Sequence, residues 1–149
     1  TATLTLRADR AGEYRAQCAE FCGFQHAWMA LPVTAEPQEQ YEAWAARQRQ
    51  PATPPADPLA LRGEQVFLGS TCVMCHAVAG TEAAAEHGPD LTHLASRSTL
   101  GAGVIPNDPQ HLAAWIENPN AHKPGVNMPT MKLEPDDLNG IAAYLEGLK

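Results

Sequence analysis

Residues 72–76 read Cys-Val-Met-Cys-His, and this pentapeptide constrains the fold more than any other feature of the sequence. Two thiols three residues apart, followed at once by an imidazole, form the attachment signature of a c-type haem. The Cys72 and Cys75 thiols can bond to the vinyl groups on one edge of the porphyrin, and His76 can then ligate the iron. A thioredoxin-like dithiol would need a βαβ context, and a zinc site would need another pair of ligands. The motif therefore predicts one covalently bound haem c and a role in electron transfer.

A second iron ligand is predicted in the loop of residues 123–129, Lys-Pro-Gly-Val-Asn-Met-Pro. Pro124 and Gly125 favour a turn, and Pro129 stiffens the backbone directly after Met128. A thioether from such a loop is a soft ligand that raises the haem potential. We predict Met128 as this ligand. Met131 is the alternative, and its other expected role is to fill a gap in the core.

Capping residues and apolar positions predict a small helical domain over residues 59–149. Asp57 and Asp108 each precede a proline, an arrangement typical of a helix N-cap. The expected helices run from Asp57 to about Ser70, over 111–118 until Pro119, and from about Pro135 towards the end of the sequence. Residues 77–107 are expected to be rich in loops. Because so few helices give a thin core, we expect the haem to form its centre.

Two stretches in this part of the sequence resemble class I cytochromes c. Residues 88–97, Gly-Pro-Asp-Leu-Thr-His-Leu-Ala-Ser-Arg, resemble the stretch after the haem site, and residues 117–128 resemble the run towards the axial Met. The resemblance covers residues 59–149. It implies four residues around the haem: Met128 as ligand, Pro89 with its carbonyl on the His76 ring, Arg97 near a propionate and Trp115 beside the Met face. It also implies a close crossing of the first and last helices through Gly63, Phe67, Ile141 and Tyr144.

Residues 18–29, Cys-Ala-Glu-Phe-Cys-Gly-Phe-Gln-His-Ala-Trp-Met, crowd soft and borderline ligands into one short segment. Thiolates, an imidazole and a thioether together suit copper better than any hard cation, and a loop between two strands can fold them around one centre. The segment resembles the binuclear CuA loop of cytochrome c oxidase subunit II. That resemblance implies five copper ligands: Cys18 and Cys22 as bridges, the backbone carbonyl of Glu20, the His26 imidazole and the Met29 thioether.

The resemblance also predicts that this copper site is incomplete. The CuA family uses a second His from an upstream strand, whereas residues 1–17 contain no His. We expect residues 1–49 to be the C-terminal fragment of a cupredoxin-like CuA domain, with Pro32 at an edge or a bulge. The expected strands cover 3–7, 14–17 and 29–35. No stable CuA centre is expected in the chain as written, and a disulfide or two free thiols at Cys18 and Cys22 is the alternative.

Four prolines within residues 50–58 predict a semi-rigid linker after a short helix over 39–50. The expected fold is therefore mainly α, a class I cytochrome c domain preceded by an incomplete β segment and this helix.

A net charge of −7 makes nucleic acid an unfavourable partner, and no apolar run approaches the 18 or so residues needed to span a bilayer. The remaining histidines match no metal-site spacing and are expected to be exposed. They are His87, His93, His111 and His122.

Taken together, the two resemblances point to the C-terminal part of a caa3-type cytochrome c oxidase subunit II. They imply electron transfer from haem c towards CuA and the oxygen-reducing haems of another subunit, without oxygen chemistry on this chain. The implied partners are other oxidase subunits and a donor such as cytochrome c or the bc1 complex, at the periplasmic, extracytoplasmic face of a bacterial membrane. Two alternatives remain. One is a stand-alone electron shuttle with a vestigial CuA segment; the other is a haem peroxidase or sensor with an open iron position, against which Met128 argues.

Overall fold

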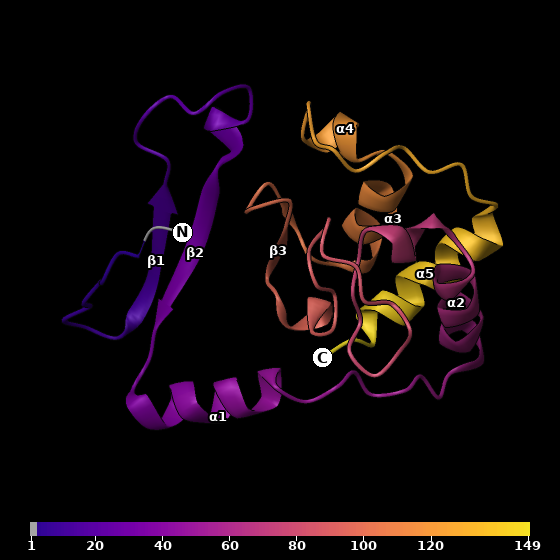
Figure 1. Cartoon of the computed structure of the whole chain (residues 1–149), viewed down its shortest axis with the longest axis horizontal. Coiled ribbons are helices and arrows are strands. Elements are labelled where there is room, and N and C mark those ends of the chain that lie inside the picture. Colours follow the sequence, from indigo (N-terminus) through magenta and orange to yellow (C-terminus); the bar gives the residue numbers. More distant parts are fainter. Residues whose placement is uncertain (1–2) are drawn as a thin grey trace.

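The computed structural model describes residues 3–149, and its elements fall into two groups along the chain (Figure 1). The first group is a hairpin and a helix. Strands β1 (Gly12–Gln17) and β2 (Ala30–Ala35) pair antiparallel, with Tyr14 opposite Val33. A short 3-10 turn, η1 (His26–Trp28), lies in the loop between them, and helix α1 (Gln38–Gln48) follows β2.

One expected strand is absent from this group. Residues 3–8 have no regular structure, so the prediction of a strand over 3–7 is wrong. The apolar side chains of Leu4 and Leu6 are largely exposed, because no neighbouring strand in the described chain covers them. Pro32 lies within the two-stranded sheet, where each strand has a free edge, as expected for a residue that cannot donate a ladder hydrogen bond.

The second group is helical and contains the Cys-Val-Met-Cys-His motif. Its helices are α2 (Pro58–Leu68), α3 (Pro109–Glu117), α4 (Pro119–His122) and α5 (Pro135–Glu146). Between α2 and α3 lie the 3-10 turns η2 (Thr71–Met74) and η3 (Leu94–Ser96) and a small hairpin of β3 (Thr99–Leu100) and β4 (Ile105–Pro106).

Helices α2 and α3 begin at the N-cap residues that were predicted from the sequence. The Asp57 carboxylate accepts the Leu59 and Ala60 N–H groups, and the Asp108 carboxylate accepts the His111 N–H. Pro119 ends α3 as predicted but also begins the single turn of α4, because proline fits the first position of a helix.

Helices α2 and α5 cross closely at two glycines. A Cβ on Gly63 would overlap the Gly140 carbonyl, and a Cβ on Gly140 would lie 3.2 Å from the Gly63 nitrogen. The rings of Phe67 and Tyr144 pack beside this crossing at a centroid distance of 5.6 Å. Gly140 is unfavourable for an isolated helix, and the crossing explains its presence because a side chain there would separate the two backbones.

The hydrophobic core belongs wholly to the second group. Every buried apolar residue of the described chain lies between Ala60 and Leu148, whereas β1, β2 and α1 contribute none. The largest side chains that are almost fully buried are Tyr144, Phe67, Ile141, Leu148, Val78 and Pro119. No helix in the described chain is both long enough and apolar enough to cross a membrane.

Candidate haem and copper sites

The Cys-Val-Met-Cys-His motif folds into a tight turn directly after α2. The Ser70 hydroxyl accepts the Cys72 N–H, and the N–H groups of Cys75 and His76 donate to the Cys72 carbonyl at 3.1 and 3.0 Å. Cys72 packs partly against the core, whereas Cys75 is exposed. Both cysteines are free thiols, so both are available for thioether bonds.

The ring of His76 is held by the loop that follows the motif. Its Nδ1 lies 2.7 Å from the Pro89 carbonyl oxygen, which is the contact implied by the resemblance to cytochromes c. When Nδ1–H donates to this carbonyl, Nε2 carries the free lone pair and can serve as a metal ligand. A Cβ on Gly88 would lie 2.8 Å from the imidazole Cε1, so only glycine lets the loop approach the ring this closely. This donor set fits a covalently bound haem c.

Asp90 fixes the next turn of the same loop. Its carboxylate accepts the Thr92 N–H at 2.8 Å, and its carbonyl accepts a guanidinium N–H of Arg97 at 2.9 Å. Burial opposes ionisation of Asp90, but the hydrogen bonds from Thr92 and the charge of Arg97 hold the pKa of its carboxyl below its ordinary value. Arg97 itself is exposed, and its role towards a haem propionate stays a prediction.

Both candidate axial methionines are half-buried in the segment between α4 and α5. Lys123 anchors the start of this segment by donating from Nζ to the Gly101 carbonyl at 2.9 Å, and burial lowers the pKa of its amine. Gly125 donates its N–H to the Asn120 side chain at 3.1 Å. These contacts fix the loop that carries Met128, whereas Met131 donates its own N–H to the Glu117 carbonyl. The choice between the two stays a prediction.

Trp115 is half-buried on α3. A Cβ on Gly101 would lie 2.8 Å from its ring, and the His122 ring lies 6.5 Å away between centroids. Trp115 therefore lies close to the residues that anchor the 123–129 loop, and its position beside a Met face stays a prediction.

The expectation of exposed histidines is wrong for His93. This residue is only 8% exposed, and its Nε2 lies 3.1 Å from the Gln50 carbonyl oxygen in the linker. Its Nδ1 is buried without a hydrogen-bond partner. The local sequence gives no sign of this burial, because the segment that covers His93 lies 43 residues earlier in the chain. Two further histidines are half-buried, His111 against the Asp108 carboxylate and His122 against Trp115, whereas His87 is exposed.

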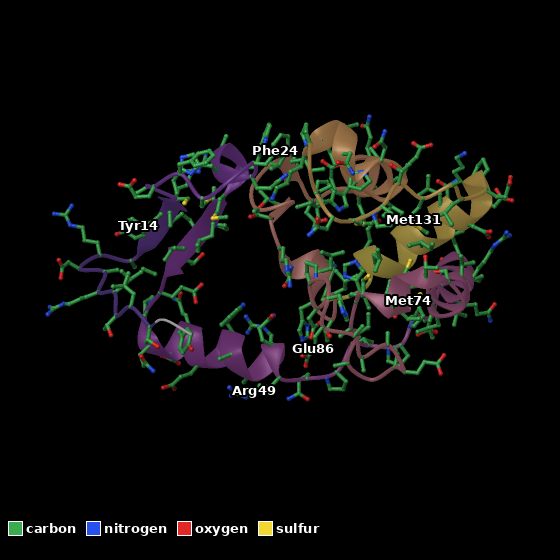
Figure 2. The ribbon with its side chains drawn as sticks, turned by 45° about the horizontal axis from the view of Figure 1, so that its top comes forward. Tyr14, Phe24, Arg49, Met74, Glu86 and Met131 are labelled. Atoms are coloured by element: carbon green, nitrogen blue, oxygen red, sulfur yellow. The ribbon has the colours of Figure 1, made fainter. Side chains whose placement is uncertain are left out.

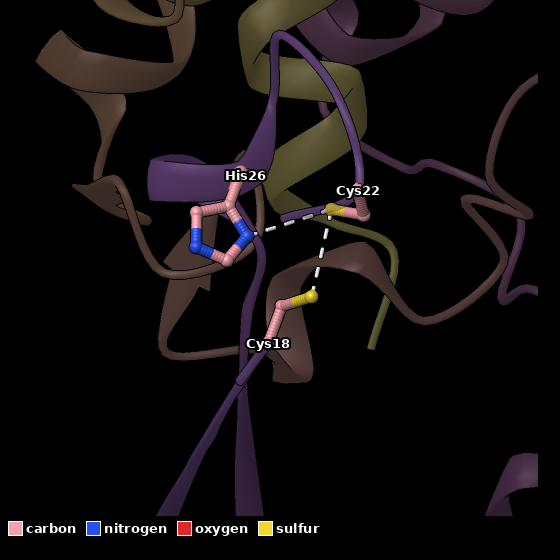
Figure 3. A group of neighbouring side chains, drawn as sticks. All are labelled: Cys18, Cys22 and His26. Carbon is pink, nitrogen blue, oxygen red and sulfur yellow. Dashed lines mark hydrogen bonds between the residues drawn. The ribbon is translucent and has the colours of Figure 1, made fainter. Parts of the chain in front are cut away.

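All five residues of the predicted copper site meet in the loop between β1 and β2. The loop closes where Cys18 donates its N–H to the Met29 carbonyl. The Cys18 Sγ lies 3.1 Å from the Glu20 carbonyl oxygen. It also lies 3.5 Å from the Cys22 Sγ (Figure 3). The Cys22 Sγ in turn lies 3.7 Å from the His26 Nδ1 and 3.7 Å from the Met29 Sδ.

This loop is chemically suited to a soft metal ion. Ligand atoms of Cys18, Cys22 and His26 all lie within 4.8 Å of one another. Both cysteines are free, so the disulfide alternative does not hold in this structure. Hydrogen bonding to Cys18 raises the pKa of the Cys22 thiol, with smaller contributions from burial and from the charge of Cys18. Metal binding would therefore have to displace a proton from this thiol.

Known proteins match both the helical group and the segment that precedes it. The family model "Cytochrome c" matches residues 60–149. Cytochrome c oxidase subunit 2 of Alkalihalophilus pseudofirmus is 37% identical over 97% of this chain. The same subunit of Bacillus subtilis is 31% identical over 96% of this chain. In each case the match covers 42% of the relative, so the chain spans about two fifths of the length of these relatives.

A solved structure of the c-type cytochrome SorU from Sinorhizobium meliloti matches 60% of this chain and 90% of its own, with a TM-score of 0.44 and 22% identity. The sequence similarity to subunit 2 proteins confirms the expected resemblance to cytochrome c oxidase subunit II. The family match confirms the expected mainly α fold for the part that contains the haem motif. Because the family model covers well over half of the chain, the protein belongs to the cytochrome c family.

Proposed function

We propose that this chain transfers electrons through a covalently bound haem c as part of a cytochrome c oxidase subunit II. The observation that carries the proposal is the turn at residues 72–76, with two free thiols and an imidazole whose Nδ1 is occupied by the Pro89 carbonyl. The similarity of nearly the whole chain to subunit 2 sequences supports membership in an oxidase complex. We further propose the periplasmic face of a bacterial membrane as its place, and cytochrome c or the bc1 complex as donor.

Bound haem c supplies reversible one-electron exchange at its iron. The chain contributes attachment and orientation. Cys72 and Cys75 would hold the porphyrin edge, and His76 would ligate the iron through Nε2 while Pro89 prevents the ring from rotating. Met128 would supply the second ligand. Ligands held in place by the chain would limit rearrangement when the charge of the site changes.

The axial ligand is tested by comparing Met128→Ala with Met131→Ala. Loss of a soft ligand that favours ferrous iron should lower the haem potential and abolish the Met–iron charge-transfer band in the first variant only. Redox titration and absorption spectra of the haem-loaded chain measure both effects. If Met131→Ala loses the band and Met128→Ala keeps it, the assignment is wrong. A parent protein that binds no haem at all would refute the proposed function itself.

We also propose that residues 18–29 form the copper-binding loop of the subunit. The five predicted ligands lie together, but a CuA centre of this family needs a second imidazole to give both metals matched surroundings. We therefore expect these five ligands alone to bind copper without forming a stable mixed-valence pair. Copper analysis and electron paramagnetic resonance test this. Two tightly held coppers with a seven-line signal would show that another ligand completes the site.

The proposed domain organisation follows the two groups of elements. Residues 1–49 would be part of a CuA domain, residues 50–58 a linker, and residues 59–149 the haem domain. The placement of the core supports this division, since all buried apolar residues of the described chain fall in the last of these segments.

A further inference from the structure

The tip of the copper loop touches the loop that carries Met128. Gln25 donates from its side-chain amide to the Pro124 carbonyl, and the ring of Phe24 lies where a Cβ on Gly125 would stand. Gly125 has a φ of +82°, a conformation that favours glycine. Because glycine has no side chain, the Phe24 ring can pack directly against the backbone of this turn. Figure 2 shows Phe24 at the end of the hairpin that faces the helical group.

A second contact joins the two groups at the other end of the hairpin–helix segment. The buried His93 ring holds the Gln50 carbonyl, and two residues later Ala52 donates its N–H to the Ala79 carbonyl at 2.8 Å. Pro51 lies against Gly80, whose φ of +97° again favours glycine. Ala52 packs against the hydrophobic core. The first residues of the linker are therefore fixed to the haem domain and do not act as a free tether.

We infer that the copper-loop segment docks on the haem domain at two points, with Phe24 and Gln25 holding the axial-Met loop and Gln50 and Ala52 held by His93 and Ala79. Gln25 is the neighbour of His26, and Pro124 lies four residues before Met128. The first contact thus links a predicted copper-ligand loop to a predicted iron-ligand loop through one hydrogen bond. Its use for electron transfer rests on the proposed function, whereas the docking itself does not.

The two contacts are expected to depend on each other. Phe24 remains 77% exposed, so the tip contact alone buries little apolar surface and would be short-lived. Fixing the linker keeps the tip near its partner and raises its effective concentration there. Gln25 and Phe24 are thus positioning residues, because each acts by placing the copper loop and neither is a predicted ligand.

Photo-cross-linking tests the tip contact directly. In the haem-loaded full chain, Phe24→p-benzoylphenylalanine should cross-link within one chain to the peptide containing Pro124–Val126. The matched control is the same replacement at Phe21, which lies on the same loop and is 83% exposed. We expect little cross-linking to this peptide from position 21. Absence of the product from position 24, or equal yields from both positions, would overturn the inference.

The dependence of the tip contact on the linker contact is tested by adding a second substitution to the chain that carries p-benzoylphenylalanine at position 24. Ala52→Pro removes the N–H that is donated to the Ala79 carbonyl, and His93→Phe removes the ring nitrogen that holds the Gln50 carbonyl. Each should lower the cross-link yield by about fivefold, the population change expected for loss of one hydrogen bond. His87→Phe is the control, because His87 is exposed. An unchanged yield in Ala52→Pro would overturn two-point docking, and a normal haem spectrum in that variant would show that the proposed function stands regardless.

Discussion

Gly88 lies so close to His76 that any side chain would press on the imidazole, since a Cβ would be 2.8 Å from Cε1 and 2.9 Å from Nδ1. Its own N–H donates to the Cys75 carbonyl at 2.6 Å, so the loop cannot retreat without losing a hydrogen bond. The orientation of the ring therefore depends on a residue that carries no functional group. Sequence reasoning missed Gly88 as a site residue. The only available signal was a glycine directly before Pro89.

Gly88→Ala should displace the imidazole from the Pro89 carbonyl and weaken the iron–nitrogen bond. Overpacking of this kind costs about 1–3 kcal/mol. We expect a lower yield of haem-loaded protein, a lower thermal midpoint and a shifted potential, measured on the purified holoprotein. Pro89→Ala is the control because it keeps the carbonyl oxygen that the ring contacts. Equal behaviour of the two variants would mean that the close approach of Gly88 does not orient His76.

The buried phenol of Tyr144 should make the stability of the fold depend on pH. Burial, together with the nearby Glu64, raises the pKa of its phenol to about 12, above the ordinary value of about 10. A folded-state pKa above the unfolded value gives stability that is complete below about pH 10 and lost as pH rises to about 12. The hydroxyl is also buried without a partner.

Tyr144→Phe should therefore match or exceed the parent in thermal stability at neutral pH, because no hydrogen bond is lost. Towards pH 12 it should lose less stability than the parent. Thermal unfolding at pH 7 and at about pH 11 measures the difference, with the half-exposed Tyr41→Phe as control. An equal alkaline loss in Tyr144→Phe and the parent would contradict the assignment.

At the scale of elements, the crossing of α2 and α5 depends on two glycines that let the helix backbones approach closely. The two glycines are unequal: a Cβ on Gly63 would overlap the Gly140 carbonyl, whereas a Cβ on Gly140 would meet Gly63 atoms at 3.2 and 3.3 Å. Both sets of contacts are with backbone atoms, so no side chain can move to relieve them, but only the overlap at Gly63 forces the two helices apart.

Gly63→Ala should accordingly destabilise the protein by about 3 kcal/mol or more, because the two helices must separate. Gly140→Ala should cost much less, since a small shift suffices and alanine regains up to about 1 kcal/mol of helix propensity. Chemical denaturation of the two haem-loaded variants gives both values. A similar loss for both would show that the crossing tolerates separation and that the asymmetry has no energetic meaning.

The same elements show which parts of the fold a single sequence predicts. Asp57 and Asp108, each followed by proline, mark the starts of α2 and α3 because capping is a local interaction. The expected strand over residues 3–7 does not form, because a strand requires a partner that local alternation does not supply. Burial of His93 and the contact between Gln25 and Pro124 depend on residues 43 and 99 positions apart, beyond the reach of any local pattern.

For the candidate sites, the sequence predicted which candidate ligands lie together better than it predicted what surrounds them. The five residues of the copper loop were predicted from their crowding in one short segment together with the resemblance to the CuA loop, and the structure places them together. His76 and Pro89 were paired through the family resemblance, and their contact is present. The distinction between Met128 and Met131 depends on the path of a loop, which neither their spacing nor their similar burial determines.

At the scale of the whole molecule, the buried core lies in only one of the two groups of elements. All buried apolar residues of the described chain lie between Ala60 and Leu148, whereas the hairpin and α1 expose most of their apolar side chains. A segment without buried apolar surface contributes little to the free energy of unfolding. The haem domain should therefore fold independently of the copper-loop segment, even though the two are in contact.

This is tested by removing residues 1–49 while keeping Gln50, so that the contact with His93 is retained. Because surface contacts of this kind contribute within about 0.5 kcal/mol, the thermal midpoint of the haem-loaded remainder should change by less than about 4 °C. Its absorption spectrum should be unchanged, since every predicted haem ligand is still present. A chain of residues 1–49 alone should lack a cooperative transition, as expected for a two-stranded sheet and one helix without a core. A large fall in the midpoint of the haem domain would mean that the hairpin and α1 support the core through contacts stronger than the two docking points.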